Sequence, residues 1–340
     1  MDLRMSLRLP KPNGKANERP EEKNFFILGR PVAEDALILG ISGRYEFKNK
    51  GIDVFIDAMG QLNRNNGLGK EVLAFILVPA GHAGANKELL HNLELPYQAV
   101  TSTDLYLTHY LNDSANDPVM NRIRAQKLRN SEEDKVKIFF VPSYLNGDDG
   151  VLNMPYYDLL VGMDLTAFPS YYEPWGYTPL ESLAFKVPTI TTTLAGFGLW
   201  VKEHYNMNHP GIEVIHREDG DASNVATAIA EWVKNYTQVG ETEMQKDRDN
   251  AKDVSRIALW DNLINYYKQA YTIALNQVSV RLKDLPANMN ESVSYIEKQL
   301  TVNNPSWVSV MIHRSIPEKL IALEELSKNL WWAWNEGARE

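Results

Sequence analysis

The chain has 340 residues, 44% of them hydrophobic, which is enough to bury the cores of about two domains. Its net charge of -9, without any long basic run, disfavours a nucleic-acid partner, and no stretch reaches the roughly 18 consecutive apolar residues of a membrane span. The absence of cysteine excludes disulfides and thiolate metal sites. No apolar run near the start resembles a signal peptide, so the composition predicts a soluble, cytoplasmic protein.

The composition of the chain changes at Ala36. Residues 1–35 are rich in Pro, Asn, Lys, Arg and Glu, and we expect them to form a poorly ordered lead-in. A short apolar strand follows at 37–42, then a polar loop bounded by glycines at 43–51. Apolar residues at helical spacing predict a helix over 52–62.

Further apolar runs along the chain predict the same succession of strand, loop and helix. Near-continuous apolar runs are typical of parallel strands that are buried on both faces. The predicted strands are 72–78, 137–141, 164–168, 187–192 and 211–215. The polar stretch 101–133 is predicted to be a helical excursion. Strands that alternate with helices favour a doubly wound, Rossmann-like α/β domain with a parallel sheet over residues 36–275.

The end of the chain has a different organisation. An apolar stripe predicts a long helix over 254–275, and the polar, irregular residues 276–305 are interpreted as a linker. Residues 315–335 form an amphipathic helix that ends in three tryptophans within four residues. Because so many aromatic rings cannot be covered by a single helix, we interpret 306–340 as the truncated start of another domain.

The stretch 168–198 contains the strongest candidate site. Glu173 and Glu181 are separated by seven residues around a Pro-Trp-Gly-Tyr turn, the first on a loop after a strand and the second on the following helix. Ligands of open α/β sheets bind at this end of the strands. The two carboxylates suit an acid/base pair on a glycoside, or acceptors for sugar hydroxyls; alternatively, Glu181 only complements the helix dipole. The turn costs helix propensity, which favours a function.

A second candidate is the cationic loop after the first strand. Arg44 and Lys50 lie six residues apart, where two cations and backbone N–H groups can converge on a diphosphate. The alternative is two solvated surface charges. The glycines Gly196 and Gly198 are interpreted as a loop that lets backbone approach a ligand, and His82 as a histidine of a surface loop without a catalytic role.

Three motifs together resemble the glycogen synthase family of fungi and animals, and especially its bacterial, Bacteroidetes-type relatives. They are Gly-Arg-Tyr-Glu-Phe-Lys-Asn-Lys-Gly at 43–51, Pro-Ser-Tyr-Tyr-Glu-Pro-Trp-Gly-Tyr-Thr-Pro at 169–179, and Ala-Gly-Phe-Gly at 195–198. The resemblance covers residues 36–275. It implies the carboxy-terminal, nucleotide-binding half of a two-Rossmann-domain glycosyltransferase of the GT-B type. Such an enzyme transfers glucose from UDP-glucose to the non-reducing end of an α-1,4-glucan with retention of configuration, without a cofactor or metal.

The same resemblance implies roles for individual residues. Arg44 and Lys50 match the pair that binds the donor diphosphate and, with Glu173 beside the donor hexose, are the expected catalytic residues. Glu181 matches the acid at the ribose, and Tyr156 the tyrosine that stacks on uracil. The remaining residues expected to bind the donor are Tyr172, Trp175, Gly176, Tyr177 and Thr178.

The chain departs from the family in two respects. Residues 1–35 match nothing of the family's amino-terminal half, which carries the acceptor site, so we expect that the chain alone does not catalyse. The arginine-dense helix that senses glucose 6-phosphate in the eukaryotic enzymes is matched by 243–253, where acids dilute the basic residues. We therefore expect no activation by that effector.

The tail carries another resemblance. Residues 316–335 are similar to the opening of bacterial α-glucan phosphorylases, which implies a fused phosphorylase module; alternatively, this helix docks back on the first domain. Two other readings of the whole chain remain open. One is a nucleotide-sugar-binding or glucan-binding module without turnover, and the other is a retaining glycosyltransferase with a different acceptor.

Overall fold

The computed structural model describes residues 25–27, 30–33, 35–65, 67–94, 106–205 and 211–283. The chain divides into two compact units, Met1–Asn262 and Leu263–Glu340. All of the strands and most of the helices described below belong to the first unit. Of the second unit, the structure describes the greater part of one long helix.

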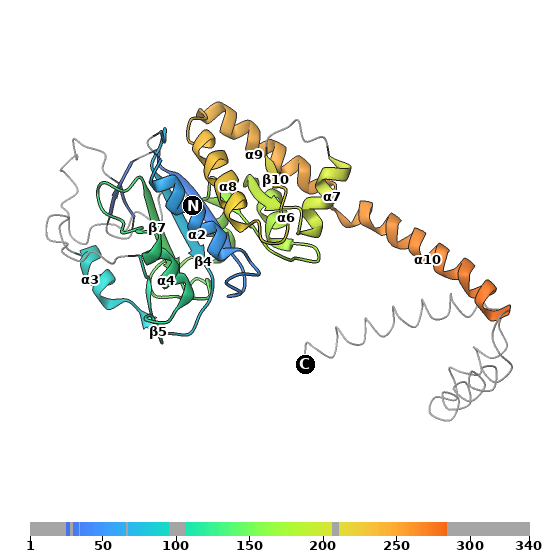
Figure 1. The fold of residues 1–340 in the computed structure, drawn as a ribbon, viewed down its shortest axis with the longest axis horizontal. Coiled ribbons are helices and arrows are strands. Elements are labelled where there is room, and N and C mark those ends of the chain that lie inside the picture. The colour runs from blue at the N-terminus through green and yellow to red at the C-terminus, as the bar shows by residue number, and fades with distance from the viewer. Residues whose placement is uncertain are drawn as a thin grey trace, which may run out of the picture. The chain divides into compact units, whose positions relative to one another are not determined.

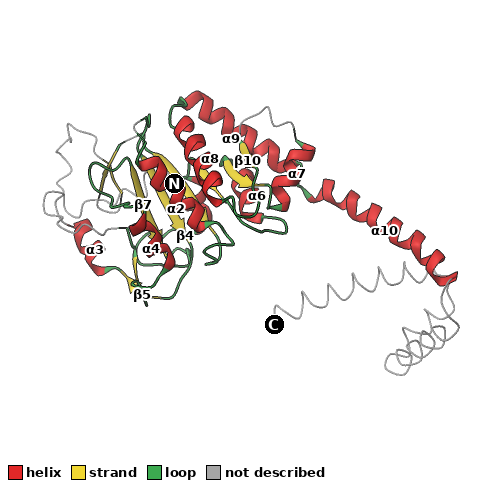
Figure 2. Ribbon diagram, viewed as in Figure 1, coloured by secondary structure: helices red, strands yellow, loops and turns green. Residues whose placement is uncertain are grey.

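A six-stranded parallel sheet forms the centre of the first unit (Figures 1 and 2). Its strand order is β10-β9-β8-β3-β4-β7. The strands are β3 (Leu37–Ser42), β4 (Val72–Leu77), β7 (Val136–Val141), β8 (Leu165–Ala167), β9 (Thr189–Thr192) and β10 (Ile212–Ile215). Each lies within one residue or two of its predicted range. The predicted α/β class with a Rossmann-like parallel sheet is therefore confirmed.

Burial on both faces explains why these strands read as continuous apolar runs. All residues of β3, β4 and β7 are buried, and β3 pairs with β4 over its full length, from Leu37 opposite Val72 to Ser42 opposite Leu77. Alternate residues of β3 enter different cores, with Leu39 on one face and Ile38 on the other. Each core requires its own layer of helices.

Helices cover both faces of the sheet (Figure 1). On the first face lie α2 (Ile52–Asn63), α4 (Pro118–Ala125) and α8 (Ala222–Tyr236), which share the largest core. The second face is covered by α3 (Lys87–Glu94) and α5 (Tyr156–Val161), and beside β9 and β10 by α6 (Tyr177–Ala184), α7 (Gly196–His204) and α9 (Glu241–Arg256).

The strand order reverses between β3 and β8. From β3 the chain proceeds outward through β4 to β7, then returns to the other side of β3 and proceeds outward through β8 and β9 to β10. The chain therefore leaves β3 towards one side of the sheet and β8 towards the other, and the exit loops of both strands lie at the carboxyl ends of these two neighbours. Such a switch point is where open α/β sheets bind ligands.

Two predicted segments differ from the structure within the first unit. His82 lies on a short strand, β5 (His82–Ala85), which pairs with β6 (His109–Leu111), instead of on a surface loop. Its ring is half-buried and lies edge-on to that of His109, with centroids 4.8 Å apart, which stabilises this extended segment. The excursion predicted over 101–133 contains β6 and α4, and its residues 101–105 lie outside the described part of the chain.

The predicted helix over 254–275 is interrupted. Helix α9 ends at Arg256 and α10 (Trp260–Lys283) begins four residues later. The side-chain amide of Asn262 donates to the carbonyl oxygen of Arg256 over 2.9 Å, which satisfies a helix-terminal acceptor and favours the break. Helix α10 then continues to Lys283, into the range predicted as a linker.

At the two ends of the chain the predictions are tested only in part. Within the predicted lead-in, the described residues form two short antiparallel strands, β1 (Phe25–Ile27) and β2 (Arg30–Val32), instead of irregular chain. The predicted phosphorylase-like segment 306–340 lies outside the described residues, as do 1–24 and 284–305.

Candidate functional site

Two loops meet at the switch point. The exit loop of β3, residues 43–51, and the exit loop of β8, residues 169–176, are joined by a backbone hydrogen bond of 2.8 Å from Tyr171 N to Asn49 O. At the start of α2, Gly51 adopts a left-handed conformation (φ 68°) against the carbonyl of Pro169. A Cβ atom there would lie 1.8 Å from this oxygen, so only glycine permits the approach.

The principal polar contact at this junction is an ion pair between Lys50 and Glu173. The lysine Nζ donates to Glu173 Oε2, although 123 residues separate the two in sequence. Their side chains are only 12% and 18% exposed. A lysine that is largely removed from water and neutralised by one carboxylate is available for a diphosphate, provided that the carboxylate finds another donor.

The backbone around Glu173 is fixed by the loop that precedes α7. Glu173 N donates to Leu194 O over 3.1 Å, and its carbonyl accepts from Gly196 N over 3.0 Å. Gly196 and Gly198 begin α7, so the predicted ligand-approach loop is wrong. A Cβ on Gly196 would lie 2.2 Å from Pro174 O and one on Gly198 2.3 Å from Thr192 O, so these glycines permit close backbone packing.

Arg44 points away from this ion pair. Its guanidinium is 78% exposed and pairs with Glu46 Oε1 at 2.9 Å. The structure therefore brings Lys50 and Glu173 together but leaves Arg44 on the solvent side of the same loop. The loop itself is anchored by Tyr45, whose hydroxyl donates to Asp117, the N-cap residue of α4; burial and this carboxylate raise the pKa of Tyr45.

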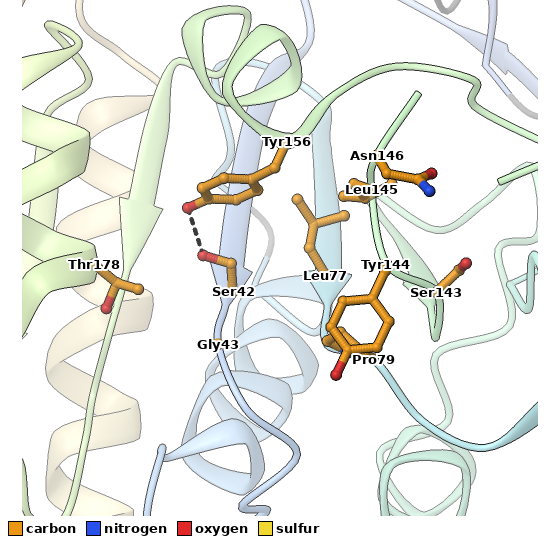
Figure 3. Close-up of a pocket in the computed structure, with 10 residues that line it drawn as sticks. All are labelled: Ser42, Gly43, Leu77, Pro79, Ser143, Tyr144, Leu145, Asn146, Tyr156 and Thr178. Carbon is orange, nitrogen blue, oxygen red and sulfur yellow. Dashed lines mark hydrogen bonds between the residues drawn. The ribbon is translucent and has the colours of Figure 1, made fainter. Parts of the chain in front are cut away.

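A cavity of about 320 Å³ opens beside the loop of β3. Its lining comes from five segments: Ser42 and Gly43; Leu77 and Pro79; Ser143, Tyr144, Leu145 and Asn146; Tyr156 on α5; and Thr178 on α6. Figure 3 shows Tyr156 above Ser42, with Tyr144 and Asn146 across Leu77 from them. This volume lies at the lower end of the range of about 300–1,000 Å³ for small-molecule sites.

Tyr156 occupies a fixed position in this cavity. Its hydroxyl and that of Ser42 lie 2.7 Å apart, which joins α5 to the end of β3. Burial raises the pKa of Tyr156 to about 12, so the phenol is neutral at physiological pH. Its ring supplies a flat apolar surface on the cavity wall, as stacking of a base requires.

Gly43 lies at the edge of the cavity and next to the Lys50 side chain. A Cβ on this residue would lie 3.8 Å from Cδ of Lys50, so the lysine stem passes over the edge of the cavity. Thr178 lines the opposite rim, one turn before Glu181 on α6. A ligand with a ring in the cavity would thus extend past Lys50 towards Glu173.

Glu181 has partners of its own and does not contact Glu173. It is half-buried on α6, and Tyr157 OH donates to its Oε1 over 3.4 Å. The Tyr157 ring stacks on Phe185 with centroids 5.0 Å apart. Desolvation by burial raises the pKa of Glu181, whereas the Tyr157 hydroxyl opposes the shift.

Replacement of Glu181 by glutamine is expected to stabilise the protein at neutral pH. Because the pKa of Glu181 is raised in the folded state, the folded protein favours the protonated acid. The contribution of the protonated acid to stability is present below the unfolded pKa of about 4.3 and is lost as the pH rises through the folded pKa. Thermal unfolding should show a rise of about 1 °C at pH 7, limited by solvent screening, and none at pH 3.5. An equal shift at both pH values, or a lower melting temperature at pH 7, would contradict this prediction.

The other predicted donor residues occupy different environments. Tyr172 and Tyr177 are 61% and 70% exposed beside the site. Trp175 faces inward, edge-on to Phe197 at 5.7 Å. Gly176 caps α6 with φ 108°, a conformation that favours glycine. Thr178 lines the cavity, so only Tyr172, Tyr177 and Thr178 of this group offer side-chain surface to a ligand.

Sequence reasoning missed several residues of the site. Ser42, Tyr144 and Asn146 line the cavity, Tyr157 binds Glu181, and the buried Arg217 donates to Pro169 O. Ser42 is the last residue of β3, and Tyr144, Asn146 and Arg217 follow the carboxyl end of a parallel strand by no more than five residues. That shared position is the signal that identifies them, since each is a single polar or aromatic residue without a motif.

The described residues contain neither a membrane-spanning helix nor a cluster of metal-ligating side chains. None of the helices there is both long and apolar enough to cross a membrane. No group of three or more His, Asp or Glu side chains in that part of the chain is placed to share a metal ion.

Comparison with known proteins extends these observations. The protein-family model described as glycogen synthase matches residues 32–104 and 97–318. Glycogen [starch] synthase isoform 2 of Saccharomyces cerevisiae is 28% identical over 307 residues, covering 72% of this chain and 44% of the yeast protein. The Neurospora crassa and rat liver glycogen [starch] synthases are 29% and 27% identical, each with 72% of this chain and 42% of the relative covered.

The chain spans less than half the length of these curated relatives. Among solved structures, it is similar to the Candida albicans trehalose-6-phosphate phosphatase N-terminal domain, with 10% identity and a TM-score of 0.44 over 72% of this chain and 42% of the other. The family-model match extends over most of the Rossmann-like unit and includes both loops of the switch point. The chain belongs to the glycogen synthase family.

Proposed function

We propose that this chain forms the donor side of a retaining glucosyltransferase that moves glucose from UDP-glucose to the non-reducing end of an α-1,4-glucan. The observation that carries the proposal is the Lys50–Glu173 ion pair at the switch point, beside the cavity that contains Tyr156. An aromatic ring, a cation and a carboxylate thus follow one another, as the base, the diphosphate and the hexose do in a sugar nucleotide.

The chemistry gives each group a role. When the bond between glucose C1 and the UDP oxygen breaks, negative charge grows on the diphosphate and the sugar becomes oxocarbenium-like. Lys50, joined by Arg44 after a rotation away from Glu46, stabilises that growing charge more than it stabilises the bound donor. Glu173 orients the hexose and stabilises its positive charge, so attack from the same face requires no enzyme nucleophile.

The remaining contacts fix the nucleoside. The Tyr156 ring stacks on uracil, and Glu181 accepts hydrogen bonds from the ribose hydroxyls. Thr178 faces the cavity between these two groups, and the exposed Tyr172 and Tyr177 border the hexose and the acceptor. Trp175 and Gly176 contribute indirectly, since they shape the turn that carries Glu173.

The acceptor side is proposed to come from a second, amino-terminal Rossmann half, as in a GT-B glycosyltransferase of the cytoplasm. The curated relatives are more than twice the length covered here, which leaves room for such a half. The resemblance of 316–335 to phosphorylases stays a prediction, because those residues lie outside the described part of the chain and the family model reaches residue 318.

Three of the four cations of α9 support the expectation that glucose 6-phosphate does not activate the protein; Lys252 is the fourth. Lys246 pairs with Glu243 at 3.1 Å, Arg248 with Asp164 at 2.9 Å and Arg256 with Asp253 at 2.9 Å. A phosphate would have to compete with a carboxylate at each of these three side chains.

Calorimetric titration of the chain with UDP, ADP and uridine tests the proposed function. We expect UDP to bind at least tenfold more tightly than uridine, because charge-assisted hydrogen bonds to phosphate contribute about 1.5–3 kcal/mol. UDP should also bind more tightly than ADP, since the small cavity suits a pyrimidine. Equal affinities for UDP and uridine would refute the diphosphate assignment.

A glucan-elongation assay on the chain alone distinguishes a complete enzyme from a donor-binding half. We expect UDP binding without elongation. Elongation by the chain alone would contradict the requirement for a second half. Binding of glucan without binding of UDP would favour the alternative of a non-catalytic glucan-binding module.

A further inference from the structure

Arg217 is a buried cation beside the donor site. It follows β10 by two residues and is 5% exposed. Its Nη1 donates to Pro169 O, and its Cζ lies 5.5 Å from the centroid of the Tyr171 ring. Its Nε is buried and has no hydrogen-bond partner among the described residues. Burial lowers the pKa of Arg217, while the charge of Asp53 on α2 opposes the shift.

The backbone of Arg217 is held in place as well. Its N–H donates to Thr193 Oγ1 over 3.0 Å, and this hydroxyl in turn donates to Arg217 O over 3.3 Å. The backbone of Arg217 is therefore fixed by a contact between the exit loops of β9 and β10, and its guanidinium extends to the exit loop of β8. Burying an arginine that bonds no carboxylate costs folding free energy, so a contribution to stability does not explain why Arg217 is buried here.

The carbonyl that Arg217 binds lies at the junction of both halves of the site. Pro169 O contacts Gly51, which directly follows Lys50, and Glu173 lies four residues beyond Pro169 on the same loop. Rotation of this peptide group would shift the lysine loop and the glutamate loop relative to each other. The position of one oxygen atom thus affects both members of the Lys50–Glu173 pair.

We propose that Arg217 is a positioning residue that holds the Pro169 carbonyl and thereby aligns Lys50 with the diphosphate of the donor. This inference rests on the proposed function, because the proposed function assigns the donor diphosphate to Lys50. Arg217 acts through the two loops and does not touch the nucleotide. Its effect is confined to the phosphate part of the ligand, since the cavity that takes the nucleoside is bordered by other segments.

Replacement of Arg217 by methionine, which keeps the volume but removes the donors, tests this inference. We expect UDP to bind about tenfold more weakly to the variant, because small misplacements of a binding group are costly, whereas uridine binds with unchanged affinity. In a Lys50→Ala background the same replacement should change UDP affinity less than twofold. Arg217→Lys, which keeps one donor, should restore part of the loss and serves as the test if the methionine variant does not fold.

Lys137→Met is the matched control. Lys137 is 3% exposed and its Nζ also donates to backbone carbonyls, those of Ser131 and Asp134, but it pairs with Glu71 as well, at 3.3 Å, and lies at the opposite end of the sheet. This replacement should leave UDP affinity unchanged even where it alters the melting temperature. A general effect of removing a buried cation would instead appear in both variants.

The outcomes separate the inference from the proposed function. Loss of UDP and uridine binding together in Arg217→Met would indicate collapse of the whole site and would overturn the positioning role. Unchanged UDP affinity would overturn it as well. A wild-type chain that binds no UDP would overturn the proposed function, and this inference with it.

Discussion

Replacement of Gly51 by alanine is expected to lower the melting temperature by roughly 6–12 °C, corresponding to about 3 kcal/mol. Part of this loss is the cost of a left-handed conformation for a residue with a Cβ, about 1 kcal/mol. The greater part is the clash with Pro169 O at 1.8 Å, which the backbone must relieve by movement. Because that movement separates the loops of Lys50 and Glu173, UDP affinity should fall at least tenfold.

Gly220→Ala provides the matched control for this experiment. Gly220 has φ 79°, close to the 68° of Gly51, but a Cβ there would meet nothing within 4 Å. The control should therefore show only the conformational cost, a decrease of roughly 2–4 °C, and unchanged UDP affinity. Equal decreases in the melting temperature of the two variants, measured by differential scanning fluorimetry, would show that the contact with Pro169 contributes nothing to the loss of stability.

Removal of the Lys50 side chain is expected to weaken UDP binding by about 10- to 100-fold. A charge-assisted hydrogen bond to a phosphate contributes about 1.5–3 kcal/mol, and Lys50 is shielded from solvent. Arg44→Ala should have a smaller effect, about threefold, because its guanidinium is largely exposed and must leave Glu46. Calorimetric titration of the wild type and both variants measures these differences directly.

Two further variants test whether the effect of Lys50→Ala is specific to the binding site. Glu173→Gln removes the carboxylate that competes with the diphosphate, so UDP affinity should stay the same or rise slightly. Lys246→Ala removes a surface lysine that also pairs with one glutamate, at 3.1 Å, and should leave binding unchanged. If Lys50→Ala and Lys246→Ala had the same small effect, Lys50 would be an ordinary surface charge.

The sheet could be predicted from the sequence because its strands carry a strong local signal. Leu37–Ser42 and Val72–Leu77 are buried at every position, so each appears as an uninterrupted apolar run. The errors arose where tertiary contacts decide the structure. The segment from His82 is extended because it pairs with β6, and the helix predicted over 254–275 breaks where Asn262 binds the Arg256 carbonyl.

The candidate site was predictable to a similar extent. The sequence predicts that Lys50 and Glu173 bind one ligand, and the structure places their side chains in contact. The glycines of the 196–198 motif were misread, because a sequence does not show which backbone atom a glycine approaches; here it is Pro174 O and Thr192 O. Arg217 was missed since its contacts depend on the order of three strands, which only the folded sheet reveals.

The Lys50–Glu173 ion pair also has a consequence for selectivity. A site that is electrically neutral at rest has little attraction for simple anions, because inorganic phosphate would release Lys50 only by leaving the Glu173 carboxylate without a counter-charge. A sugar nucleotide offers an anion to the lysine and hydroxyl donors to the glutamate at the same time. In the proposed function, the closed pair would therefore favour a ligand that offers both an anion and hydroxyl donors over free phosphates.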